Sequence, residues 1–113
     1  MACGTLQRYG PAYLASSVAD ILSQADATKY IEIRRIHLNN TQTSSSTFTL
    51  FVGASGGSSA GTALYTTKLI PSNDVFIDWR LLKLLSTEYL TGFCPTGANR
   101  ITIEIEYYER PAV

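Results

Sequence analysis

Two glutamates near the end of the chain, Glu104 and Glu106, come nearest in type and spacing to a catalytic pair. In NRITIEIEYYE they alternate with isoleucines, so on an extended strand they share one face, about 7 Å apart. Paired carboxylates hydrolyse glycosidic bonds when they line a deep sugar cleft. A small single domain seldom has such a cleft, and Arg34, Arg35 and Arg100 are available as ion-pair partners. We therefore expect a strand face that is either solvated or charge-paired across strands.

The other reactive side chains form no recognisable site. His37 is the only histidine, and it lies mid-strand between two apolar residues that face the other way. Cys3 and Cys94 have no metal-ligand spacing; we expect two free thiols, and a disulfide between them is the alternative. The glycine- and serine-rich stretch 53–61 lacks the Gly-Lys-Ser/Thr of a phosphate loop, and no serine lies in a Gly-x-Ser-x-Gly elbow. The sequence predicts a protein that is not an enzyme and holds neither metal nor cofactor.

The composition favours a protein that associates with other proteins. The 113 residues suffice for one domain; 45% are hydrophobic, 16% are charged, and the formal net charge is zero. Without a basic excess the chain has no electrostatic attraction for a phosphate backbone, so direct nucleic-acid binding is not expected. No window reaches the roughly 18 apolar residues of a membrane span, and no signal peptide is visible. We expect a soluble protein made in a cytoplasm, with few charges to desolvate on association.

Short segments of alternating polarity predict an all-β fold. In KYIEIRRIHLNN, residues 29–40, the apolar residues keep to one face up to Ile33 and resume at Ile36, offset by one residue. A period of two that slips once indicates a β-bulge, here at Arg34 and Arg35. The alternative is that Arg35 points inward and is paired there.

Further strands follow at spacings of about 8 to 12 residues, with turn residues between them. They are predicted at 47–52, 64–70, 75–79, 81–85, 89–93 and 101–108, and residues 18–22 form either a strand or one helical turn. Seven or eight such strands predict a β-sandwich or jelly roll, in which two sheets bury their alternating faces. Residues 18–113 are predicted to form this single domain. Residues 1–17 show no lasting period and are predicted to be an extended N-terminal arm.

Tyrosine is more abundant than so small a core requires. The chain has seven tyrosines besides its single tryptophan and four phenylalanines. Tyrosine and tryptophan supply large, stiff contact areas with a polar tip, which is why interfaces select them. Any one tyrosine could instead close the rim of the sandwich. The residues expected at an assembly interface are Leu6, Tyr9, Tyr13, Leu14, Tyr107 and Tyr108. Sugar stacking on Trp79 is the alternative, which would make the chain a carbohydrate- or receptor-binding module.

Three stretches, in this order, resemble small virion proteins of tailed bacteriophages. They are YIEIRRIHLNNTQTSSSTFTLFVGASGGSSAGTALY, IPSNDVFIDWRLLKLLSTEYLTGFC and NRITIEIEYYE. The shared features are a strand ending in Leu-x-Asn, a Thr/Ser link, an apolar strand entering a Gly/Ser loop, an Asp-Trp element and a final alternating strand. The resemblance covers residues 29–109 and is one of pattern and order, without a catalytic signature.

This resemblance implies a non-enzymatic β-sandwich component of a virion. Such proteins are capsid decoration or minor capsid proteins, or parts of the neck or tail, and they act as oligomers, often trimers on shells or rings on tails. The implied partners are further copies of the chain and the major capsid protein or neck and tail proteins, with assembly in the cytoplasm of a bacterial host. An arm such as residues 1–17 often ties one subunit to its neighbour, so we expect it to become ordered on docking.

Overall fold

The computed structural model describes residues 5–24, 26–53, 62–79, 81–86 and 88–111. Every regular element within these residues is a β-strand, which confirms the all-β prediction. In chain order the strands are β1 (Thr5–Tyr13), β2 (Ala19–Ser23), β3 (Lys29–Asn40), β4 (Ser46–Gly53), β5 (Thr62–Ile70), β6 (Val75–Asp78), β7 (Leu82–Leu84), β8 (Tyr89–Phe93) and β9 (Ile101–Pro111). The described residues thus contain nine strands where seven or eight were expected, and the additional strand is β1.

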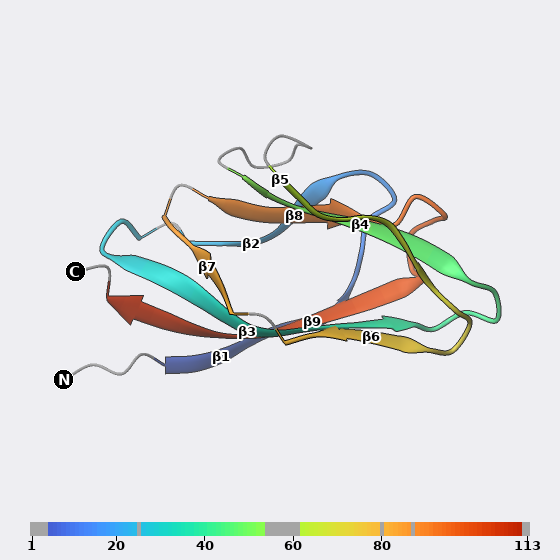
Figure 1. Ribbon diagram of the computed structural model, residues 1–113, viewed down its shortest axis with the longest axis horizontal. Helices are drawn as coiled ribbons and strands as arrows, with labels where there is room; N and C mark the ends of the chain where they lie inside the picture. The colour runs from blue at the N-terminus through green and yellow to red at the C-terminus, as the bar shows by residue number, and fades with distance from the viewer. Residues whose placement is uncertain (1–4, 25, 54–61, 80, 87, 112–113) are drawn as a thin grey trace.

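The strands form two antiparallel sheets that pack face to face (Figure 1). One sheet has the order β1-β9-β3-β6, with β7 also paired to β3, and the other has the order β2-β8-β4-β5. The pairs β1–β9, β2–β8, β3–β6 and β4–β5 are all antiparallel neighbours. The chain is therefore one long double ribbon, rolled up so that successive pairs fall in alternate sheets. This strand order is that of a jelly roll, with β7 added to it.

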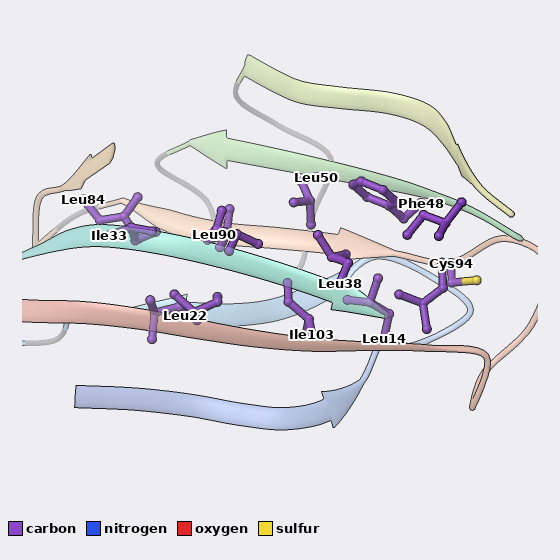
Figure 2. Close-up of a cluster of buried hydrophobic side chains, with 14 of the residues drawn as sticks. Leu14, Leu22, Ile33, Leu38, Phe48, Leu50, Leu84, Leu90, Cys94 and Ile103 are labelled. Atoms are coloured by element: carbon purple, nitrogen blue, oxygen red, sulfur yellow. The ribbon is translucent and has the colours of Figure 1, made fainter. Parts of the chain in front are cut away.

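The core lies between the two sheets and comes from the alternating faces of the strands (Figure 2). Burial of each aliphatic or aromatic side chain of this kind contributes about 1.5–3 kcal/mol. The centre of the five-stranded sheet, where β3 lies beside β9, supplies about half of the fully buried set. That set is Ile31, Ile33, Ile36, Leu38, Phe48, Leu50, Ile70, Leu84, Leu90, Ile101, Ile103 and Ile105.

The β-bulge predicted in β3 is present. The register of β3 against β9 shifts by one residue between Ile33 and Arg35, so Arg34 is the inserted residue. Because of this insertion, Ile33 and Ile36 both point into the core although they are three positions apart. Arg35 lies opposite Glu106 on the outer face of the sheet, so the alternative of an inward Arg35 is wrong.

The N-terminal segment is extended, as predicted, but from Thr5 to Tyr13 it is a strand of the sandwich. This strand pairs with β9 along one edge of the five-stranded sheet, with a register shift between Tyr9 and Ala12. The expectation that the arm orders only on docking is therefore wrong for Thr5–Tyr13, since pairing with β9 already fixes its backbone. Residues 1–4, which include Cys3, and residues 54–61 of the glycine- and serine-rich stretch lie outside the described residues.

The turn before β6 is fixed by hydrogen bonds that start in β3. The amide of Asp74 donates to the Pro71 carbonyl at 3.2 Å, and Asn73 has the left-handed φ of 55° that an asparagine tolerates in a turn. The buried side-chain amide of Asn40 donates to the carbonyls of Ile70 and Pro71 at 3.0 and 3.2 Å. The turn predicted from Pro-Ser-Asn-Asp is thus confirmed, and it delivers β6 to its place beside β3.

The strands β5 and β6 meet across the sandwich at one flank. The phenol of Tyr65 in β5 donates to the Asp78 carboxylate of β6 at 2.6 Å. The rings of Phe48 and Phe76 lie 5.8 and 5.1 Å from that of Tyr65, in tilted and edge-to-face arrangements. This aromatic cluster joins the two sheets, so the edge strand β6 is held on its inner face as well as by β3.

Candidate assembly surface

Part of the predicted interface lies on the outer face of the five-stranded sheet. Residues directly opposite each other in antiparallel strands point to the same face, so the register defines rows across the sheet. Leu6 of β1 lies opposite Tyr108 of β9, and the row continues to Glu32 of β3. Tyr13 lies opposite Thr102 at the other end of β1. Leu6 and Tyr13 are 50% and 52% exposed, so both offer apolar surface to a partner.

The other three predicted interface residues contribute to the inside of the sandwich. Leu14 is 2% exposed, and its amide donates to the Ile101 carbonyl at 2.9 Å. Tyr9 lies opposite the buried Ile105, and both Tyr9 and Tyr107 pack against the core. A partner could reach Leu14 only if the core opened, so we exclude it from the assembly surface, and we assign Tyr9 and Tyr107 to the core.

The glutamates of the possible carboxylate pair, Glu104 and Glu106, belong to an ion-pair network. Arg35 lies 3.2 Å from Glu104 and 3.4 Å from Glu106, and Arg8 lies 3.7 Å from Glu104. The side chains of Arg35 and Glu104 are each only 20% exposed, so solvent screens this pair less than a pair on the open surface. The expected charge-paired strand face is confirmed for Arg35, and Arg8 is a partner that the sequence did not indicate.

A second group of charges covers the aromatic residues at the end of the same face. Arg110 donates to Glu32 at 2.9 Å, and its guanidinium lies 4.7 Å from the ring of Tyr108. The ammonium of Lys83 lies 4.4 Å from the ring of Tyr30. Each cation is attracted to the negative face of the ring. Tyr108 thus presents an ordered, charge-balanced surface beside the exposed Leu6.

Trp79 lies on the same outer face, directly after β6. It is 62% exposed, and the guanidinium carbon of Arg35 lies 5.7 Å from its ring. Val75 and Ile77 of β6, which lie opposite Asn39 and His37, are exposed as well. Of these residues, only Trp79 was predicted from the sequence. The available signal was that Val75, Ile77 and Trp79 alternate with Phe76, which is needed for the core.

The remaining candidates for chemistry are not brought together. In its row across the five-stranded sheet, His37 lies between Glu104 of β9 and Ile77 of β6. Cys94 is a buried free thiol whose sulfur lies 3.1 Å from the Thr96 hydroxyl. Over the described ranges, no three His, Cys, Asp or Glu side chains gather as metal ligands would. The same residues include no helix that is long and apolar enough to cross a membrane.

The side chains of Asp26 and Tyr107 have a displaced pKa, and neither lies on the outer face described above. Hydrogen bonds from the hydroxyl and amide of Thr28 lower the pKa of the exposed Asp26, in the turn before β3. Burial, and then the charge of Glu109, raise the pKa of the Tyr107 phenol. Glu109 itself accepts hydrogen bonds from the side-chain amides of Gln7 and Gln24 at 2.9 and 2.8 Å. These groups stabilise the end of the sandwich and form no reactive site.

Comparisons with known proteins add one structural similarity. No protein-family model matches this sequence, and no curated protein matches it. A solved structure of a Tobacco streak virus coat protein dimer is similar to this chain, with a TM-score of 0.44 and 11% sequence identity. The similarity covers 96% of this chain and 86% of that chain. A likeness of this degree carries no argument about function, which is therefore argued from the surface of the chain itself.

Proposed function

We propose that this chain is a non-enzymatic structural protein of a virion, acting through assembly with copies of itself and with other virion proteins. The observation that carries the proposal is the outer face of the five-stranded sheet. There the charges are paired among themselves, as in the Arg35–Glu104 contact, while large apolar side chains such as Leu6 and Trp79 stay exposed. Such a face loses little on desolvation and gains from burial, which suits a permanent contact.

The jelly-roll strand order supports this function by analogy. Jelly rolls occur in viral capsid proteins, and also in lectins and cupins, so the fold by itself does not select a function. The sequence resemblance to tailed-phage virion proteins favours the first of these. We propose capsid decoration or a minor capsid role ahead of a neck or tail component, as a trimer or ring assembled in the cytoplasm of a bacterial host.

The proposed docking surface is the row at the β1 edge. Leu6 and Tyr108 lie opposite each other there, and Tyr13 extends the surface along the same strand. Since β1 is already ordered, contact by this surface does not require the entropic cost of folding an arm. The partner would be the major capsid protein, or a neck or tail protein in the second placement.

Binding to particles tests the function. Purified wild-type protein and a Leu6→Asp/Tyr13→Asp variant would be mixed with capsids and tails of the encoding virus, prepared without this protein, and sedimented together. We expect the wild type to sediment with one kind of particle and the variant to remain in solution. Leu69→Asp is a matched control, because Leu69 is 56% exposed but belongs to the other sheet. Failure of the wild type to bind either particle would remove the proposal.

A second candidate is a carbohydrate- or receptor-binding module, which the exposure of Trp79 favours. Its indole is 62% exposed beside Arg35, so one ring face could stack on a sugar while arginine donates hydrogen bonds. A glycan array probed with wild type and Trp79→Ala decides this reading. Binding that the substitution abolishes supports it, whereas an array without a wild-type signal excludes the glycan reading.

A further inference from the structure

Exposed apolar side chains concentrate along one edge of the five-stranded sheet. The described residues include eight large hydrophobic side chains that are exposed, and five of them fall between positions 75 and 85. These five are Val75, Ile77, Trp79, Leu81 and Leu85. This edge is formed by β6 and β7, which both pair with β3 and follow each other along it. We call residues 75–79 and 81–85 the β6 edge.

The edge strand β6 has a more regular backbone than the edge strands β1 and β5. Edge strands are protected by bulges, prolines, lysines, inward-pointing charges or a very short length. The edge strand β1 contains Pro11 and an irregular register, and β5 contains two register shifts and Lys68. By contrast, β6, which has four residues and an inward Asp78, pairs with β3 in an unbroken register, and its sequence Val-Phe-Ile-Asp has neither proline nor lysine. A regular apolar edge is a template for a further strand.

The free hydrogen-bonding groups of β6 can be assigned from two observed bonds. The Asn40 amide donates to the Asp74 carbonyl at 2.9 Å, so Asp74 directs its carbonyl toward β3, while its amide donates to the Pro71 carbonyl. Because this direction alternates along an antiparallel strand, Phe76 and Asp78 also bond to β3, whereas Val75 and Ile77 point their amides and carbonyls outward. In agreement, the Val75 amide donates to the Asp74 side chain at 2.8 Å and not to β3. Because that amide is occupied, the outward groups left for a partner strand are the Val75 carbonyl and both backbone groups of Ile77.

We propose that a second copy of this chain pairs with this edge, β6 against β6, in antiparallel register about a two-fold axis at Ile77. A two-fold axis perpendicular to the sheet keeps outer faces together, so Ile77 lies opposite the partner's Ile77 and Val75 opposite the partner's Trp79. The outer row of the joint is then entirely apolar, and a β-branched residue beside an aromatic one is a favourable cross-strand pair. An axis at Phe76 would satisfy the same backbone groups but would place Trp79 opposite the partner's Asn73, outside the apolar row.

The charges of the edge are compatible with self-association. Asp78 is turned inward, where it contacts the Tyr65 phenol at 2.6 Å, and Lys83 lies over the ring of Tyr30. With a net charge of zero, two copies have no overall repulsion. Val75, Ile77 and Trp79, the residues that this register buries, are 45%, 37% and 62% exposed, so at about 150–250 Å² for a large side chain they offer on the order of 300 Å². Since a standard interface buries roughly 800 Å² per partner, the dimer is expected in the micromolar range.

This dimer requires only a second copy of the chain, so its test is independent of the virion function. Sedimentation velocity across roughly 1 to 200 µM protein tests it, because this range brackets a micromolar Kd. We expect a concentration-dependent shift from monomer to dimer. Ile77→Lys places two ammonium groups opposite each other in place of two buried isoleucines, and should weaken association roughly a hundredfold. The matched control Leu69→Lys, at an exposed leucine of the other sheet, should dimerise as the wild type does.

Cross-linking tests the position of the axis. Directly opposite, hydrogen-bonded residues have Cα atoms about 5.5 Å apart, within the range of a disulfide. Ile77→Cys should therefore form a covalent dimer on mild oxidation. The reaction should be much faster than for the wild type, which measures cross-linking by the native cysteines, or for Leu69→Cys, which measures it at another exposed site. A wild type that stays monomeric throughout the range, an Ile77→Lys variant that associates like the wild type, or an Ile77→Cys variant that cross-links at the background rate would each overturn the proposal. Circular dichroism establishes that each variant is folded.

Discussion

Deletion of Arg34 should leave the sandwich intact, although it removes a residue from the middle of its central strand. Without Arg34 the strand reads Ile-Glu-Ile-Arg-Ile-His-Leu, which alternates without a slip. The pairings of Ile33 and Arg35 with β9 then become consecutive, so each partner in β9 is retained. Arg34 is itself exposed. We expect a change in the free energy of unfolding of no more than about 1 kcal/mol, as for an ordinary surface change.

Deletion of His37 is the matched control, since it removes one residue from the same strand in a region of regular register. It would turn the following residues to the opposite face. Leu38 is fully buried, and its transfer to solvent costs about 1.5–3 kcal/mol. Asn40, also buried, would lose the two hydrogen bonds that its side-chain N–H groups donate, shared among three carbonyls, and the one that its oxygen accepts from the Gln42 amide, each contributing about 0.5–1.5 kcal/mol. The sum, about 3–7 kcal/mol, is comparable to the whole stability of a small domain.

Urea unfolding followed by far-ultraviolet circular dichroism compares the two deletions with the wild type. The midpoint and the slope together give the free energy, and an unchanged slope shows that the same surface is exposed on unfolding. The reasoning is refuted if deletion of Arg34 costs more than about 2 kcal/mol on this scale of surface effects. It is equally refuted if the two deletions prove equally harmful, since the bulge would then have a role beyond absorbing one residue.

Three further changes probe the packing around the proposed surfaces. Tyr65→Phe should lower the free energy of unfolding by about 1.5–3 kcal/mol, because it removes the hydrogen bond to Asp78 in the other sheet. The control Tyr13→Phe, at an exposed site, should change this free energy little, and urea unfolding measures both. Gly92→Ala should cost about 1–3 kcal/mol or more in the same assay, because a Cβ would lie 2.7 Å from the Thr49 carbonyl oxygen and 2.6 Å from a methyl of Leu50; an unchanged midpoint would contradict this close approach. The raised pKa of Tyr107 stabilises the fold below pH 10, and this contribution is lost as the pH rises through the folded pKa. The ionisation of Tyr107 is followed as the difference in phenolate absorbance between the wild type and Tyr107→Phe. This difference should titrate above pH 10.

The strands could be predicted because apolar and polar residues alternate along them, and this alternation reflects which side chains are buried. All eight predicted segments agree with observed strands to within about three residues, and the segment at 18–22 corresponds to a strand and not to a helical turn. The slip at Arg34 located the bulge, since β-structure has a strict period of two. The strand β1 escaped prediction for a physical reason. Gly10 and Pro11 interrupt its pattern, and an edge strand with only one neighbour needs less regularity than a central one.

The surface was harder to predict because exposure depends on which face of a strand is covered by the other sheet. Leu6 and Tyr9 are both apolar residues of β1, yet the register places Leu6 outside and Tyr9 against the core. No single-sequence pattern distinguishes them without the pairing to β9. The β6 edge was overlooked for the same reason: Val75 and Ile77 look like core residues until Phe76 is seen to occupy the inner face.

The double-ribbon topology determines when each surface exists. The β1 row, which is Leu6, Tyr108 and Glu32, joins residues about as far apart as the chain allows, as in the pairing of Leu6 with Tyr108, so it forms only when both ends have folded onto each other. Loop closure over such a distance is slow relative to local pairing. The β6 edge, in contrast, joins residues nearer in sequence, such as Leu38 and Phe76, with the paired strands β4 and β5 between them. Self-pairing through β6 could thus precede completion of the β1 row, and docking through that row would be reserved for complete subunits.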